Sequence, residues 1–238
     1  MTQSMKPVRV KTLYCEGVAM NKNTGKMTKK ETKEVLSLLE EMYPDARCAL
    51  NHETPFQLLV ATMLSAQSTD KTVNRVTEKL FTVCSTVQDF LQLQQSELEE
   101  KIKEIGLYRN KAKNILAMCR ELVTRFGGEV PSTMEELLSL PGVGRKTANV
   151  VLSNAFNVPA IAVDTHVFRV SNRIGLVAAD NVLDTENQLL GGIPKEMWSS
   201  AHHWLIWHGR RVCDAKKPKC DLCTLKQHCH YFSRTGKQ

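Results

Sequence analysis

From residue 30 onward, apolar side chains recur at spacings of three and four residues, and no stretch shows sustained alternation of apolar and polar positions. This period places the apolar side chains along one face of an α-helix, whereas a half-buried strand requires alternation. Residues that start and stop helices bound these runs, as at Thr54-Pro55, an N-cap followed by a first-turn proline, and at Gly127-Gly128. The sequence therefore predicts an all-α fold.

Local signals also place the starts of individual helices. Ser96 and Glu99 have the spacing of a capping box, and Asp70, Asn110 and Thr133 each precede a new apolar period. We expect helices over 55–65, 96–105, 110–126, 133–140 and 145–156, with a further one beginning at Asp70.

The positive charge of the chain lies at its two ends. The formal net charge is +7, of which residues 1–30 carry +6 and residues 209–238 carry another +6, so residues 31–208 are at −5. Basic ends commonly bind polyanions. Residues 1–29 are polar and without periodicity, so we predict a disordered basic tail there and interpret its charge as solubilising.

No apolar run approaches the ~18–20 residues that a membrane helix needs, and the first twenty residues contain no continuous apolar region. We therefore expect neither a membrane span nor a secretory signal. The chain has eight cysteines, and at this size, without an export signal, intracellular thiols and metal ligands are a better interpretation than disulfides.

The stretch from Leu140 to Ala148 constrains function more than any other. Gly142 and Gly144 lie between a short predicted helix and a longer one. Glycine lets the backbone approach a ligand closely, and the start of the following helix offers free N–H groups and a positive dipole end. Such a turn holds phosphate, including DNA phosphate, without regard to sequence. Two glycines alone favour an ordinary turn, but Arg145 and Lys146 behind them favour nucleic acid.

Four cysteines near the C-terminus have the spacing C-x6-C-x2-C-x5-C: Cys213, Cys220, Cys223 and Cys229. Four thiols in so short and basic a segment indicate a metal site. Structural zinc sites usually show two close pairs, and here only Cys220 and Cys223 form one. Zinc and an iron–sulfur cluster both remain possible from the residues alone.

The nine residues from Leu140 to Ala148 closely resemble the helix–hairpin–helix of the DNA glycosylase superfamily. Further strings that are similar to that superfamily are Val163-Asp164-Thr165-His166, Leu64-Ser65-Ala66-Gln67, Ile105-Gly106-Leu107-Tyr108 and His202-His203-Trp204. The resemblance covers residue 30 to the C-terminus and is strongest to the endonuclease III family. It implies a bifunctional DNA glycosylase and AP lyase that excises oxidised or ring-saturated pyrimidines from duplex DNA in base-excision repair.

The resemblance assigns the chemistry to Lys146 and Asp164. A lysine at the start of a helix is disfavoured as an ammonium, which lowers its pKa and makes the amine a nucleophile. Lys146 would attack C1′, form a Schiff base and permit β-elimination. An N-cap role alone would explain Asp164. The family role adds stabilisation of positive charge at C1′, and both roles can hold together.

The resemblance also implies the cofactor and the DNA contacts. The cysteine spacing is similar to that of the family's [4Fe–4S] ligands, and the cluster would hold a loop containing Lys216, Lys217 and Lys219 against phosphates. Backbone and side-chain contacts to DNA are expected from Gly142, Val143, Gly144 and Arg145. His202 and His203 are expected to pack a helix near the cluster.

A damaged base must leave the duplex before its glycosidic bond is attacked, and the vacated space must be filled. The resemblance assigns Gln67 to that space and Leu107 to an apolar wedge beside the orphan base. Without it, Gln67 would be interpreted as a polar residue at a helix end and Leu107 as a loop leucine that covers core.

The implied architecture is two helical lobes that flank a DNA-binding cleft. A six-helix barrel with the hairpin would span 48–158, and the iron–sulfur lobe would combine 30–47 with 159–238. The partner would be double-stranded DNA containing damaged bases or abasic sites. We expect no membrane partner, a monomeric protein, and a cytoplasmic, nucleoid-associated location.

Two other functions fit parts of the sequence. A mismatch glycosylase that removes adenine or thymine would share the fold and cluster, but such relatives generally lack a lysine at position 146, and the adenine-specific ones carry a further C-terminal domain. This chain has Lys146 and ends nine residues after Cys229. A non-catalytic helix–hairpin–helix module would need neither Asp164 nor residues for base flipping.

Overall fold

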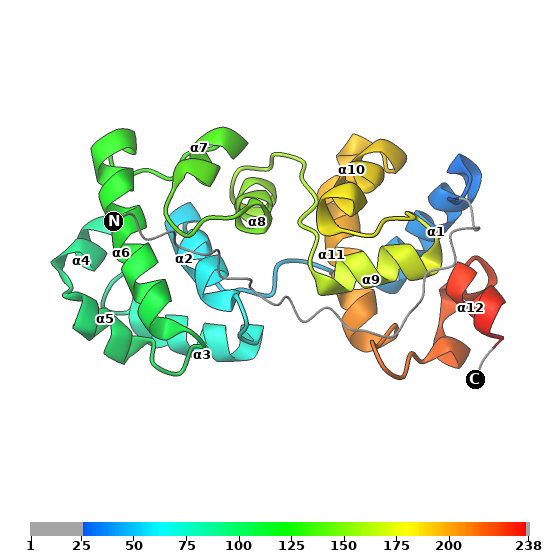
Figure 1. Cartoon of the computed structure of the whole chain (residues 1–238), viewed down its shortest axis with the longest axis horizontal. Coiled ribbons are helices and arrows are strands. Elements are labelled where there is room, and N and C mark those ends of the chain that lie inside the picture. The colour runs from blue at the N-terminus through cyan, green and yellow to red at the C-terminus, as the bar shows by residue number, and fades with distance from the viewer. Residues whose placement is uncertain (1–25, 237–238) are drawn as a thin grey trace, which may run out of the picture.

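The computed structural model describes residues 26–236, and these residues form helices and loops with no β-strand (Figure 1). The prediction of an all-α fold is therefore confirmed. The α-helices are α1 (Lys29–Met42), α2 (Pro55–Ser65), α3 (Asp70–Phe81), α4 (Val87–Gln92), α5 (Gln95–Lys101), α6 (Tyr108–Phe126), α7 (Met134–Ser139), α8 (Arg145–Ala155), α9 (Thr165–Ile174), α10 (Val182–Gly192), α11 (Trp198–Arg211) and α12 (His230–Thr235). Short 3₁₀ turns occur at Lys195–Met197, Cys220–Leu222 and Thr224–Gln227.

Most helix starts that the sequence predicted are confirmed. Thr54 caps α2 through its side chain and Pro55 is the first helical residue, and Thr133 caps α7 in the same way. The starts of α5 and α6 differ from the prediction; α6 begins at Tyr108, so Asn110 lies inside it. The N-cap of α5 is Gln94, whose N–H donates to the carboxylate of Glu97 at 2.6 Å. The helix therefore begins at Gln95, two residues earlier than a capping box at Ser96 predicts.

Buried apolar side chains form two separate cores. The first is built from α2 to α8, and the second from α1, α9, α10 and α11. Figure 1 shows the same grouping: α1 packs against α11, although more than a hundred residues separate them in the sequence. The chain thus crosses from the second core to the first after α1 and returns after α8. We propose that each core is one lobe of the molecule.

The segment that leads from α8 back to the second core is extended and packs against both cores. Ala160 and Ala162 are buried in the first core, whereas Ile161 and Val163 are buried in the second. Successive side chains of an extended backbone point in opposite directions, which explains the alternation. Because this segment is anchored on both sides, it sets the position of Asp164, which follows it directly.

The start of the described chain overlaps the predicted tail. Thr28 caps α1 and accepts a hydrogen bond from the N–H of Glu31, and Met27 is buried in the second core with its N–H donating to the carbonyl of Gly175 at 3.0 Å. The predicted boundary at residue 29 therefore lies inside a capped helix, and residues 1–25 of the predicted tail lie outside the described part. Among the described residues, no helix is both long and apolar enough to cross a membrane.

Candidate active site and cysteine pocket

One pocket is lined by residues from both cores, and it contains Lys146 and Asp164. Lys146 comes from the first turn of α8, and Asp164 comes from the residue that begins α9. Helix α11 supplies His202, His203 and Arg210 to the same pocket. The two residues that the sequence predicted to be catalytic are therefore brought together, although they belong to different cores.

Lys146 is the second residue of α8, whose N-cap is Gly144 and has no side chain to satisfy the first N–H groups. The free N–H groups and the helix dipole give this end positive character. Lys146 itself is exposed, and its side chain lines the pocket.

Asp164 is the N-cap of α9, as predicted. Its Oδ1 accepts hydrogen bonds from the N–H groups of His166 and Val167, both at 2.8 Å, and its Oδ2 lies 3.2 Å from Nδ1 of His166. Burial raises the pKa of this carboxyl, but these hydrogen bonds, together with the charges of His166 and Lys146, outweigh burial and hold the pKa well below its usual range. Asp164 is therefore a fixed negative charge in the pocket.

The expectation that His202 and His203 pack near the cysteines is wrong. Both line the pocket of Lys146 and Asp164, and the histidine that lines the cysteine pocket is His208, further along α11. Burial lowers the pKa of His203 to about 4 and also lowers that of His202, so both rings are neutral near pH 7. Neutral rings add no positive charge that would compete for the carboxylate of Asp164.

Two ion pairs join the cores around this pocket, and sequence reasoning missed both. Arg210 pairs with Asp70 at 2.7 Å, and Arg145 pairs with Glu186, a buried carboxylate, through Nε at 3.0 and 2.9 Å and Nη2 at 2.9 Å. Arg145 was expected to contact DNA. In the structure its guanidinium binds Glu186 of α10 and so holds α8 against the other core, while its side chain stays 46% exposed; the DNA contact stays a prediction.

The hairpin turn is built as the sequence predicted at its glycines, and its valine faces the core. Gly142 has φ of 76°, and a Cβ there would lie 2.8 Å from Cβ of Asn114, so only glycine fits. Nothing lies within 4 Å of where a Cβ of Gly144 would be, which leaves that side open to a ligand. Val143 is buried and its N–H donates to the carbonyl of Leu140 at 3.1 Å, so it offers DNA neither its side chain nor its N–H.

Gln67 and Leu107 are both exposed and lie in turns of unusual geometry. Gln67 follows the end of α2 with φ of 56°, and Leu107 precedes α6 with φ of 59°. The side chain of Leu107 is 56% exposed, so the alternative that it covers core is excluded. A leucine in a left-handed turn is unfavourable in backbone energy, and such conformations cluster at functional sites.

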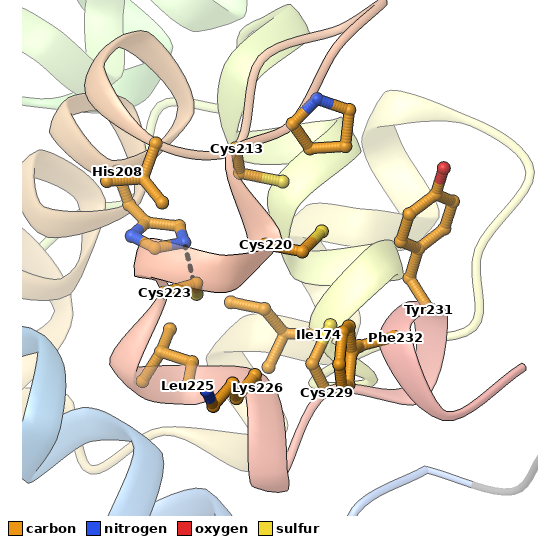
Figure 2. A pocket seen from close by; sticks show the side chains of 12 residues that line it. Ile174, His208, Cys213, Cys220, Cys223, Leu225, Lys226, Cys229, Tyr231 and Phe232 are labelled. Atoms are coloured by element: carbon orange, nitrogen blue, oxygen red, sulfur yellow. Dashed lines mark hydrogen bonds between the residues drawn. The ribbon is translucent and has the colours of Figure 1, made fainter. Parts of the chain in front are cut away.

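The four predicted metal ligands line a second pocket, enclosed by Ile174, Leu225, Tyr231 and Phe232 (Figure 2). All four cysteines are free of disulfides. Within residues 26–236, no group of three or more His, Cys, Asp or Glu side chains is gathered tightly enough to hold a single metal ion. The structure therefore brings the four thiols around one space without joining them to one another.

Two nitrogen donors are directed at these sulfurs. Nη1 of Arg173 lies 3.5 Å from Sγ of Cys213, and Nε2 of His208 lies 3.6 Å from Sγ of Cys223, the contact drawn in Figure 2. The other ring nitrogen of His208 is 3.1 Å from the hydroxyl of Tyr43 on the far side. N–H donors at sulfur are the usual surroundings of thiolate ligands, because they stabilise negative charge there.

The loop between Cys213 and Cys220 is exposed, as its predicted role requires. Lys216, Lys217 and Lys219 are all exposed. Nζ of Lys219 donates to the carbonyl of Arg211 at 3.1 Å, which ties the loop to the end of α11. The loop therefore presents positive charge on a segment that begins and ends at cysteines of the pocket.

Comparison with known proteins gives consistent matches over this whole region. The profile of the HhH-GPD superfamily of base excision DNA repair proteins matches residues 60–195. Endonuclease III of Bacillus subtilis is 50% identical over 210 residues, which cover 88% of this chain and 96% of that protein, and endonuclease III of Haemophilus influenzae is 49% identical over 205 residues, which cover 86% and 97%. A solved structure of a trapped endonuclease III–DNA covalent intermediate matches with a TM-score of 0.85 and 49% identity over 89% of this chain and 100% of that one.

Proposed function

Because this chain belongs to the endonuclease III family of the HhH-GPD superfamily and is a bifunctional DNA glycosylase and AP lyase of base-excision repair, we propose that Lys146 and Asp164 are its catalytic residues. The observation that carries the proposal is the pocket itself, since both residues line it from different cores. We propose oxidised pyrimidines in duplex DNA as its substrates. Both catalytic side chains come from one chain, so the site needs no second copy, and we propose that the monomer is the active form.

Lys146 supplies the nucleophile in this mechanism. Its amine, after losing a proton, attacks C1′ of the damaged nucleotide; the bond from C1′ to the base breaks, and the base leaves with the bonding electrons and takes up a proton. Opening of the sugar ring gives an iminium between C1′ and Nζ. Loss of a proton from C2′ then drives cleavage of the C3′–O bond, which releases the 3′ phosphate and nicks the strand.

Asp164 supplies a fixed negative charge beside that reaction. As the base leaves, C1′ becomes electron-poor, and a carboxylate that is already ionised and oriented stabilises this charge without reorganising. The hydrogen bonds from His166 and Val167 hold the carboxylate in place and keep it ionised. Its capping role and its catalytic role therefore use the same geometry.

The remaining predicted contacts divide into two groups. Gln67 and Leu107 would fill the space left by the flipped base, which agrees with their exposure. Gly142, Gly144 and the free N–H groups at the start of α8 would bind phosphate, as would the exposed loop lysines Lys216, Lys217 and Lys219. Such contacts carry no base information, so they suit an enzyme that must search all sequences. We place it at the nucleoid in the cytoplasm, where that DNA lies.

The cysteine pocket fits a [4Fe–4S] cluster. Four free thiols surround one space, apolar side chains enclose it, and N–H donors of Arg173 and His208 are directed at two of the sulfurs. Cys213, Cys220, Cys223 and Cys229 would hold the cluster as thiolates. When bound, the cluster would cross-link the C-terminal segment and so fix the lysine loop; the glycosylase and lyase steps use only Lys146 and Asp164.

We expect the protein to nick duplex DNA at a single oxidised pyrimidine and at an abasic site, and to leave undamaged duplex intact. Covalent trapping by borohydride should accompany both reactions, because the iminium is reducible. End-labelled duplexes that differ at one position, including A and T mismatches, provide the measurement. Base release from a mismatch without nicking would indicate a monofunctional mismatch glycosylase, and binding without any reaction would indicate a non-catalytic module.

Purified protein should contain about four irons per chain and show a broad absorbance near 400 nm. Cys223→Ala should lose this absorbance, whereas Cys84→Ala should keep it, because Cys84 is a buried cysteine of the first core and lies outside the pocket. Metal analysis and absorbance of anaerobically prepared protein measure both. Stoichiometric zinc with no iron would contradict the cluster and favour a zinc site.

A further inference from the structure

Gln67 and Leu107 share a backbone conformation that neither residue type favours. Both have φ near +60°, the left-handed region that glycine adopts readily and leucine rarely does. Conformations of this kind persist only where the surrounding structure holds them. The structure must therefore contain groups that fix these two turns, and the contacts between the end of α2 and the start of α6 provide them.

Lys111 makes the main connection. It lies in the first turn of α6, four residues after Leu107, and it is only 7% exposed. Its Nζ donates to the carbonyl of Leu64 at 2.8 Å and to the carbonyl of Ala66 at 2.5 Å. Ala66 immediately precedes Gln67, so one ammonium on the helix that follows Leu107 binds the backbone that leads into Gln67.

A second contact joins the same two turns. The N–H of Gly106 donates to Oγ of Ser68 at 3.2 Å, and a Cβ on Gly106 would lie 3.2 Å from the carbonyl oxygen of Gln67. Gly106 directly precedes Leu107, and Ser68 directly follows Gln67. Each turn is thus held on both sides, by Lys111 from the helix and by the Gly106–Ser68 bond from the loop.

The buried charge of Lys111 is explained by this connection. Burial lowers the pKa of Lys111, because an ammonium removed from water is costly unless its N–H groups find acceptors. The carbonyls at the end of α2 are left without helical partners and carry the negative end of the helix dipole, so they are good acceptors for a cation. An apolar side chain of equal length would fill the same volume but would not fix where these carbonyls lie.

We propose that Lys111 is a positioning residue, whose buried ammonium binds the turn of Gln67 to the helix of Leu107 so that the two side chains enter the base stack as one rigid unit. The proposal rests on the proposed function of Gln67 and Leu107 in filling the space of the flipped base. In this role Lys111 touches neither the DNA nor the reacting atoms. Loss of its ammonium should therefore impair base extrusion specifically.

Lys111→Met tests the proposal, because methionine keeps the length and the apolar packing but removes the donors. We expect base release from a lesion in duplex DNA, measured in single turnover, to slow by about 10²-fold, the effect typical of a small misplacement of positioning groups. Nicking of an abasic site in single-stranded DNA should stay at the wild-type rate, because no opposite base has to be displaced. Lys113→Met is the matched control, since Lys113 lies exposed on the same helix.

A merely structural role would slow both reactions equally, and that result would overturn the proposal. A second readout guards against instability of the variant. With 2-aminopurine opposite the lesion, insertion of the wedge changes the fluorescence of the orphan base, and Lys111→Met should lose this change at temperatures where circular dichroism shows it folded. A folded variant with the wild-type fluorescence change would also overturn it. If Lys111→Met does not fold, Lys111→Leu, which also removes the donors, is judged by the same two criteria.

A mutant cycle separates this inference from the proposed function beneath it. A Gln67→Ala, Leu107→Ala variant already lacks the wedge, so adding Lys111→Met should not slow base release further. A further loss as large as in the wild-type background would contradict action through the wedge. If the double alanine variant itself releases the base at the wild-type rate, the assignment of Gln67 and Leu107 is wrong, and the inference falls with it. If the double alanine variant is slow and Lys111→Met is not, only the inference fails.

Discussion

Lys146→Gln should abolish borohydride trapping and strand nicking, while binding to abasic duplex should stay near the wild-type level. Glutamine keeps the length and a polar end at the start of α8 but has no amine that can form a Schiff base. Lys146 is exposed and its side chain supports no core packing, so the fold should be unaffected. Gel analysis of the reduced covalent complex and of the nicked strand provides the measurement, and the expected loss is complete within detection.

Lys113→Gln is the matched control for this experiment, because it removes an exposed lysine that does not line the active-site pocket. It should trap and nick as the wild type does. Persistent trapping in Lys146→Gln would show that another amine carries out the chemistry, and the proposed mechanism would then be wrong at its central step.

Asp164→Asn should slow base release by about 10² to 10³-fold, the range typical of a lost preorganised electrostatic group. Asparagine keeps an oxygen that can accept hydrogen bonds from the N–H groups of His166 and Val167, and it is as good an N-cap as aspartate. The free energy of unfolding should therefore fall by no more than about 1 kcal/mol. Single-turnover base release and thermal unfolding measure the two effects separately. Activity close to wild type would mean that Asp164 only caps α9.

The depressed pKa of Asp164 adds a test in pH. A carboxyl whose folded pKa lies below its unfolded value of about 3.9 contributes stability above that value and loses it as the pH falls through the folded pKa. Asp164 therefore stays ionised throughout the range from about pH 5 to 8. The ratio of wild-type to Asp164→Asn activity should be constant across that range, and a ratio that declines toward acid pH would show that the carboxylate titrates during turnover.

Features that depend on hydrogen bonds within a few residues could be predicted from the sequence. The caps at Thr54 and Thr133 and the N-cap role of Asp164 are bonds between residues two or three positions apart, so the residue types at those spacings were sufficient. The glycine turn was predictable for the same reason, although the steric cause at Gly142 involves Asn114 on another helix. The resemblance of the motifs then identified the family and its activity.

Only the tertiary structure decided which side chains the two cores bring together and which they bury. Arg145 binds Glu186, 41 residues away, and Lys111 binds the carbonyl of Leu64, 47 residues away. Val143 is buried and Lys146 is exposed, although both lie in one short motif. Nothing local distinguishes a lysine that will bind buried carbonyls from one that will line a pocket. That difference arises because α2 and α6 pack within the first core, whereas the starts of α8 and α9 line a pocket formed by both cores. Such packing is fixed by contacts between residues distant in the sequence.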